Sequence, residues 1–106
     1  MRSRVSAILG SFVTSAALVL TLPGAAHAAQ GTFEYHKQPG SILEILNNPV
    51  DNRCYNIGDA RGAADNGTNR YAELYSAPGC RGDVVQTLDP GTGVDWIEFQ
   101  GVKFTR

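Results

Sequence analysis

Residues 71–88 constrain the fold more than any other part of this sequence. They begin with Tyr-Ala-Glu-Leu-Tyr, in which Ala72 and Leu74 would share one face of a β-strand. A Pro-Gly pair then marks a turn, and the segment ends in the β-branched run Val-Val-Gln-Thr-Leu. The segment therefore predicts a β-hairpin whose turn contains a cysteine, Cys80.

Beyond an apolar N-terminal run, the rest of the sequence also consists of short apolar or alternating runs between turn residues. No segment keeps a 3.6-residue period over three turns, so we predict an all-β domain of about seven short strands. The strands are expected at residues 33–36, 41–46, 53–57, 71–75, 84–88, 96–99 and 102–104. Residues 58–70 are rich in Gly, Asn and Asp, which predicts a surface loop joining two halves.

The alternation within two strands predicts which side chains are buried. Phe33 and Tyr35 should face the core, with their polar neighbours on the opposite face. Near the C-terminus, Ile97 and Phe99 should be buried, and Trp96 should be partly exposed on the other face. Trp96 is therefore a candidate contact for a partner.

The N-terminus has the pattern of a secretory signal peptide. Arg2 and Arg4 precede an uncharged run over residues 5–22, and Ala26-His27-Ala28 supplies small residues for cleavage. We predict a signal peptide over residues 1–28 and a secreted domain over residues 29–106. A single membrane anchor is the alternative, because the run is about long enough to span a bilayer.

The two cysteines, Cys54 and Cys80, both lie in the predicted secreted domain. An oxidising compartment makes a disulfide between them the expected state. Free thiols or a metal pair are the alternative, although a structural zinc would need four ligands. Without Arg2 and Arg4 the domain carries seven basic and ten acidic residues, a net charge of −3. This charge argues against binding to nucleic acid and against a cationic membrane-active peptide.

The two halves of the domain can be aligned with each other at an offset of 42 residues, and similar residues then occupy equivalent positions. The aligned pairs are Phe33 with Tyr75, Gly40 with Gly82, Ile42 with Val84, and Leu46 with Leu88. Two copies of a four-strand unit predict two Greek keys packed as a β-sandwich, because neither copy is large enough to bury a core alone.

The pattern of this repeat resembles the Greek-key motif of the β/γ-crystallin superfamily. It comprises an aromatic residue, a glycine seven positions later, a hydrophobic strand, a Leu-x-Pro-Gly loop and a closing Val-x-Phe strand, and residues 71–104 match best. The chain is similar to small secreted actinobacterial proteins, some grouped with the I36 peptidase inhibitors and others with killer-toxin-like proteins of Streptomyces. The resemblance implies that Gly82 adopts a backbone conformation which favours glycine.

The resemblance implies a non-enzymatic binding protein, with peptidase inhibition as the most concrete function and a killer-toxin-like antimicrobial as the alternative. In the first case the expected partner is an extracellular protein such as a protease, contacted by residues 58–70 through Arg61 and Arg70. We expect the domain to act as a monomer. Many microbial members of the superfamily bind calcium, but residues 47–52 depart from their pattern at two positions, so we predict no metal site and keep calcium as an alternative.

Other chemical motifs in the sequence are sparse. Glu34 and His36 would share a strand face, where they form either an exposed polar surface or the acid–base pair of a small hydrolase, which is a third functional alternative. Asn66-Gly67-Thr68 is either a turn or a glycosylation sequon.

Overall fold

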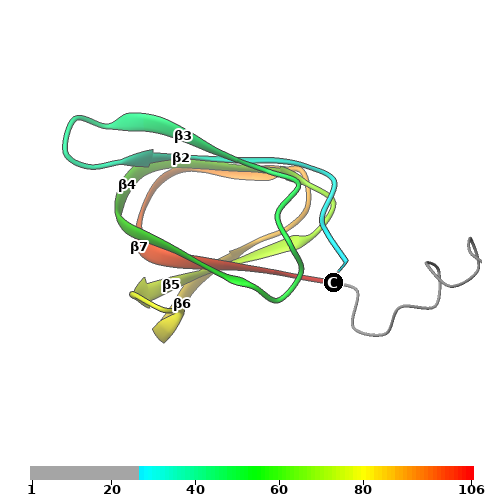
Figure 1. Cartoon of the computed structure of the whole chain (residues 1–106). Helices are drawn as coiled ribbons and strands as arrows, with labels where there is room; N and C mark the ends of the chain where they lie inside the picture. Colours follow the sequence, from blue (N-terminus) through cyan, green and yellow to red (C-terminus); the bar gives the residue numbers. More distant parts are fainter. Residues whose placement is uncertain (1–26) are drawn as a thin grey trace, which may run out of the picture.

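The computed structural model describes residues 27–106, which form one antiparallel β-sheet (Figure 1). Its strands are β2 (Gly31–Lys37), β3 (Ile42–Asn47), β4 (Cys54–Thr68), β5 (Tyr71–Ala77), β6 (Arg81–Leu88) and β7 (Thr92–Thr105). The predicted all-β class is confirmed, and residues 27–106 form six strands instead of the seven predicted for them. The predicted signal peptide, apart from His27 and Ala28, lies outside the described residues and stays a prediction.

The strand order is β3-β2-β4-β7-β5-β6, and it has an internal symmetry. In each half a hairpin lies beside a long strand, and the two long strands, β4 and β7, pair at the centre. Each half therefore contains three strands of one continuous sheet and not the predicted four-strand unit, although the strand order of the two halves is symmetric. The predicted residue alignment holds less well, because Phe33 is fully buried whereas Tyr75 lies on the outward face of β5, beside Glu73. Ala72 and Leu74 occupy the inward positions of β5.

The prediction that residues 58–70 form a surface loop is wrong. Strand β4 continues from Cys54 to Thr68, and the two short strands expected near the C-terminus are likewise one strand, β7. Every inward residue in the second half of β4 is small or polar, so the sequence shows no apolar period there. These buried residues are Ala60, Ala64, Asn66 and Thr68.

Strand β4 bends sharply along its length. The pairing of β4 with β7 shifts between Asn56 and Ala60, where three residues of β4 lie opposite one residue of β7. Such bulges bend a strand and increase its twist. Gly58 and Gly62 have φ angles of 92° and 123°, which glycine adopts without the steric cost that other residues incur. The glycine content of this segment had suggested a loop, but Gly58 and Gly62 instead allow a long strand to bend.

The bend brings the two ends of β4 together and folds the sheet into two layers (Figure 1). Asp51 precedes β4 and Arg70 follows it, and Arg70 Nε donates a hydrogen bond of 3.0 Å to Asp51 Oδ1. Asp51 also forms a β-bridge with Phe104 near the end of β7. The two layers therefore belong to one continuous sheet that packs against itself.

Aromatic side chains fill the space between the layers. The Phe33 ring meets Phe104 and Phe99 edge to face, with centroids 5.4 and 6.2 Å apart. Phe33 lies on β2 and its two partners lie on β7, which is not a neighbour of β2 in the sheet. The predicted faces are confirmed: Tyr35, Ile97 and Phe99 are buried, whereas Trp96 is exposed.

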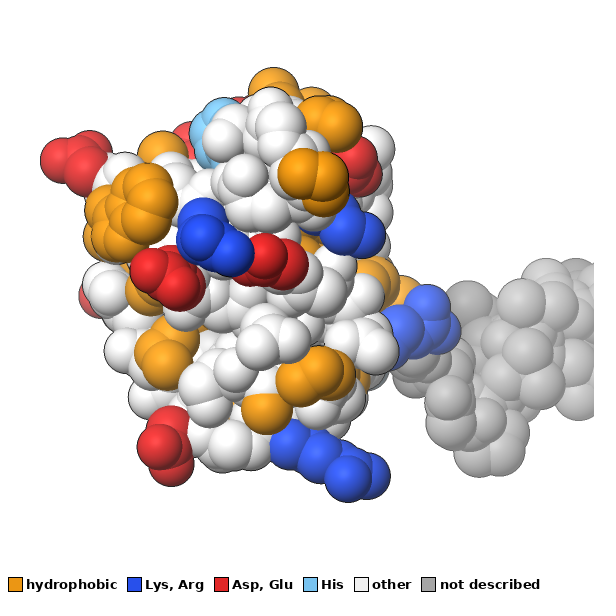
Figure 2. Space-filling model, turned by 90° about the vertical axis from the view of Figure 1, so that its left-hand side faces the viewer, with side chains coloured by type: hydrophobic (Ala, Val, Ile, Leu, Met, Phe, Trp, Pro, Cys, Tyr) orange, Lys and Arg blue, Asp and Glu red, His pale blue; other side chains and the backbone are white. Residues whose placement is uncertain are grey.

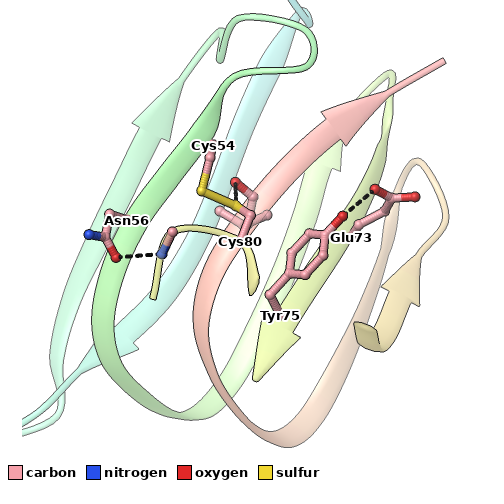
Figure 3. Close-up of a disulfide and its surroundings, with 7 residues drawn as sticks. Cys54, Asn56, Glu73, Tyr75 and Cys80 are labelled. Atoms are coloured by element: carbon pink, nitrogen blue, oxygen red, sulfur yellow. Dashed lines mark hydrogen bonds between the residues drawn. A yellow bond between two sulfur atoms is a disulfide. The ribbon is translucent and has the colours of Figure 1, made fainter. Parts of the chain in front are cut away.

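The predicted disulfide between Cys54 and Cys80 is confirmed (Figure 3). It joins the start of β4 to the β5–β6 turn across strand β7. A Cβ atom at Gly101 of β7 would lie 3.3 Å from the Cys80 sulfur, so the absence of a side chain lets the turn lie close to β7. Gly82 has a φ of 70°, as predicted, and an added side chain would collide with Ser76 Oγ.

Asn66 is a fully buried polar residue whose side chain ties three segments together. Its Nδ2 donates hydrogen bonds to the carbonyl oxygens of Arg70, Leu88 and Asp89, at 2.7, 3.0 and 3.2 Å. Its Oδ1 accepts hydrogen bonds from Thr68 N and Oγ1. Asn66 therefore lies in a strand and not in a turn, and a glycan on its buried amide nitrogen would be incompatible with this fold.

Replacing Asn66 with alanine should lower the free energy of unfolding by about 2–3 kcal/mol, because buried carbonyl oxygens would lose their donors. Urea denaturation followed by circular dichroism measures this change. The control is Asn47→Ala, at an exposed position of β3, which should change stability by less than about 0.5 kcal/mol. Equal effects of the two substitutions would contradict the structural role of Asn66.

Removing both cysteines by Cys54→Ala and Cys80→Ala should lower the free energy of unfolding by about 3.5 kcal/mol, because the unfolded chain loses a closed loop of about 27 residues. Denaturation with and without a reducing agent tests this expectation. The reductant should destabilise the wild-type protein and leave the double variant unchanged. A wild-type protein that is insensitive to reduction would contradict it.

Candidate binding surface

A hollow of about 340 Å³ opens on the outer face of the sheet, beside the β2–β3 turn. Strands β2, β4 and β7 and that turn contribute its walls. The lining residues are His36, Gln38, Ser41, Arg61, Gly62, Ala63 and Trp96. The β2–β3 turn projects at the left of Figure 1, the end that faces the viewer in Figure 2. Figure 2 shows hydrophobic, basic and acidic side chains next to one another there.

Two irregularities in strand pairing create the hollow. Between the pairs Glu34–Asp65 and Lys37–Ala60, two residues of β2 lie opposite four residues of β4. On the other side of β4, the single residue Ala63 lies opposite two residues of β7, one of which is Trp96. Such bulges redirect side chains. The hollow therefore lies where β4 separates from the regular ladder on both sides.

Side chains replace the backbone hydrogen bonds that the bulged segment lacks. His36 Nδ1 lies 3.1 Å from the Ala63 carbonyl oxygen, and Gln38 Nε2 donates to the Arg61 carbonyl oxygen at 3.2 Å. A carbonyl oxygen only accepts, so Nδ1 of His36 carries the hydrogen. The Gln38 amide also donates to Ser41 Oγ at 3.1 Å. These contacts hold His36 and Gln38 in fixed orientations at the hollow.

Arg61 carries a positive charge that is compensated within the molecule. Its Nε and Nη2 donate to the two carboxylate oxygens of Asp59 at 3.1 and 2.9 Å. The hydrogen bond from Arg61 lowers the pKa of the Asp59 carboxyl. The hydrogen bond with Asp59 raises the pKa of the Arg61 guanidinium, and the charge of Glu98, which lies opposite Arg61 on β7, makes a smaller contribution in the same direction. The surface therefore has no surplus positive charge.

Trp96 is the only tryptophan in the chain. It is 62% exposed, more than any other large hydrophobic residue among those described. The next residue in the chain, Ile97, faces the core, whereas Trp96 faces the hollow. Tryptophan is enriched among the residues that dominate binding energy at interfaces, which makes this exposed ring a candidate contact.

The structure brings together two of the three residues predicted to contact a partner. Arg61 and Trp96 line the same hollow, whereas Arg70 does not. Arg70 binds Asp51, and its side chain is only 14% exposed. Gln38 and Ser41 carried no signal of a site in the sequence beyond their place next to a Pro-Gly turn.

In the described part of the chain, no hydrogen bond or ion pair links Glu34 to His36. Within residues 27–106, no three His, Cys, Asp or Glu side chains cluster as they would around a metal ion. In the stretch considered for calcium, Asn48 Oδ1 already accepts a hydrogen bond from Gly31 N, and Asp51 binds Arg70. A helix long and apolar enough to cross a membrane is not found in the described part of the chain.

Comparisons with models of protein families, with curated proteins and with solved structures found no match to this chain. The resemblance to β/γ-crystallins therefore stays a prediction from the sequence.

The carboxyl of Asp59 should titrate below its ordinary pKa of 3.8, because the ion pair with Arg61 favours its charged form. The pair is then formed above this pKa and is lost as the pH falls through it. A carbon-detected NMR titration measures the midpoint. Arg61→Gln should raise the midpoint, whereas Arg53→Gln, at an exposed arginine, should leave it unchanged. An unshifted midpoint in the wild-type protein would contradict the pair.

Proposed function

We propose that this protein is a secreted, non-enzymatic binding protein that contacts its extracellular target through Arg61, Trp96 and the hollow between them. The observation that carries the proposal is the exposure of Trp96 at the rim of that hollow. Large aromatic and arginine side chains dominate binding energy at protein interfaces. The N-terminal sequence supports export, and the disulfide is compatible with an extracellular location.

The resemblance to peptidase inhibitors makes an extracellular peptidase the first target to test. Insertion of a flexible loop over residues 58–70 is no longer a suitable mechanism, since most of this segment is strand β4. The β5–β6 turn is also unsuited to substrate-like insertion, because Gly79, Cys80 and Gly82 have positive φ angles and not the extended conformation of a bound substrate. Inhibition would therefore depend on a rigid surface that covers the peptidase.

A panel of secreted metallo- and serine proteases tests this proposal, with residual activity and biolayer interferometry as readouts. Trp96→Ala should weaken binding to the inhibited protease at least tenfold, because a buried aromatic anchor is lost. Tyr71→Ala provides the control, since Tyr71 is an exposed aromatic residue outside the hollow. Inhibition that survives Trp96→Ala unchanged would reject this surface, and no inhibition by the wild-type protein would reject the peptidase as target.

A further inference from the structure

We infer that the hollow beside Trp96 binds a neutral carbohydrate, with one face of a sugar ring stacked on the indole. This inference rests on the proposed function, because it names a ligand class for the same surface. Sugar rings expose C–H groups on their faces, and these are attracted to the negative face of an aromatic ring. Trp96 provides an exposed ring of this kind, next to polar side chains.

The polar groups around the indole include both donors and acceptors. His36 uses Nδ1 to reach the Ala63 carbonyl oxygen, which leaves Nε2 to face a ligand. Gln38 uses its Nε2 within the protein and retains its Oε1 as an acceptor, while Ser41 Oγ accepts from Gln38 and keeps its own hydrogen. Arg61 binds Asp59 through Nε and Nη2, so its Nη1 remains a donor. Sugar hydroxyls both donate and accept hydrogen bonds, and this mixed set suits them.

The charge at the surface argues against an anionic ligand. Phosphate, sulfate and carboxylate groups are bound in proteins mainly by positively charged side chains. The one arginine in the hollow is paired with Asp59 and lies opposite Glu98. An anion would therefore meet a cation that is already compensated.

The backbone around the hollow argues against an extended peptide. A peptide that joins a sheet pairs with the free backbone groups of an edge strand. The hollow lies on β2, β4 and β7, each of which has a neighbouring strand on both sides. Its volume of about 340 Å³ is near the lower end for small-ligand sites, which fits a short part of a sugar chain.

The binding groups are held before any ligand arrives. The backbone of Trp96 is held in the paired strand β7, and the side chains of His36 and Gln38 are held by their hydrogen bonds to carbonyl oxygens of β4. Preorganised groups lose little conformational entropy on binding, which favours affinity for a weakly interacting ligand such as a sugar.

The test uses the full chain, produced in a disulfide-forming secretion host and followed by tryptophan fluorescence, because Trp96 is the sole tryptophan. It is titrated with neutral hexasaccharides of β-glucose, α-glucose, mannose, xylose and N-acetylglucosamine, and with oligogalacturonate as the anionic comparison. At least one neutral sugar should give a saturable fluorescence change, and oligogalacturonate should give none. Binding of only the anionic sugar, or of none, would overturn the inference.

Calorimetry on variants then locates the binding site. Trp96→Ala should weaken sugar binding at least tenfold, Trp96→Phe should retain part of it, and Tyr71→Ala should leave it unchanged. Asp59→Asn should release the charge of Arg61 and give measurable binding of oligogalacturonate. NMR spectra of each variant establish that it is folded. Sugar binding by a folded Trp96→Ala variant at the wild-type affinity would overturn the assignment to this hollow.

The source of the sugar is tested separately. Pull-down on insoluble cellulose, chitin and β-glucan probes structural polysaccharides, and pull-down on a high-mannose glycoprotein before and after deglycosylation probes protein-linked sugars. If no sugar binds but Trp96→Ala still abolishes binding to a protease, the ligand class fails and the proposed function stands. If neither a sugar nor a protease depends on Trp96, the proposed function fails as well.

Discussion

The pairing of β4 with β7 is the constraint on which the rest of this structure depends. These two strands join the halves of the sheet, and both layers of the molecule are extensions of them. A sheet buries a core against itself only if its central strands bend, and the bulges and the positive φ angles of Gly58 and Gly62 provide that bend. The core of aromatic rings from β2 and β7 follows from this geometry.

The same bend generates the surface that we propose to be functional. A bulge takes residues out of the backbone ladder, so their carbonyl groups have no partner on the neighbouring strand. His36 and Gln38 supply donors to the carbonyl groups of Ala63 and Arg61 and thereby lie around the hollow, while alternation with the buried Ile97 directs Trp96 outward beside them. The corner that closes the core and the site on its outer face therefore lie in adjacent segments of β4.

Charge pairing determines the chemical character of this surface. An isolated Arg61 beside Trp96 would suit an anion or an acidic protein partner. Its pairing with Asp59, together with Glu98 across the strand, removes that preference and leaves hydrogen bonding and stacking as the available interactions. Where the two ends of β4 meet, a similar pair between Arg70 and Asp51 holds the bent strand together. Arg70 is therefore a poor candidate for contact with a partner.

The sequence by itself determined the all-β class, both hairpins and the faces of the strands that contain Phe33, Leu74 and Phe99, because alternation and turn residues are local signals. The disulfide followed from the presence of two cysteines in a domain predicted to be exported. The sequence also singled out Arg61 and Trp96. Only the tertiary structure showed that β4 is one strand, since its inward positions are occupied by residues such as Ala64 and Asn66 that no hydrophobic pattern reveals. The hollow, and the roles of Gln38 and its neighbours, depend on how strands distant in sequence pair, and that pairing is decided by the packing of the whole sheet.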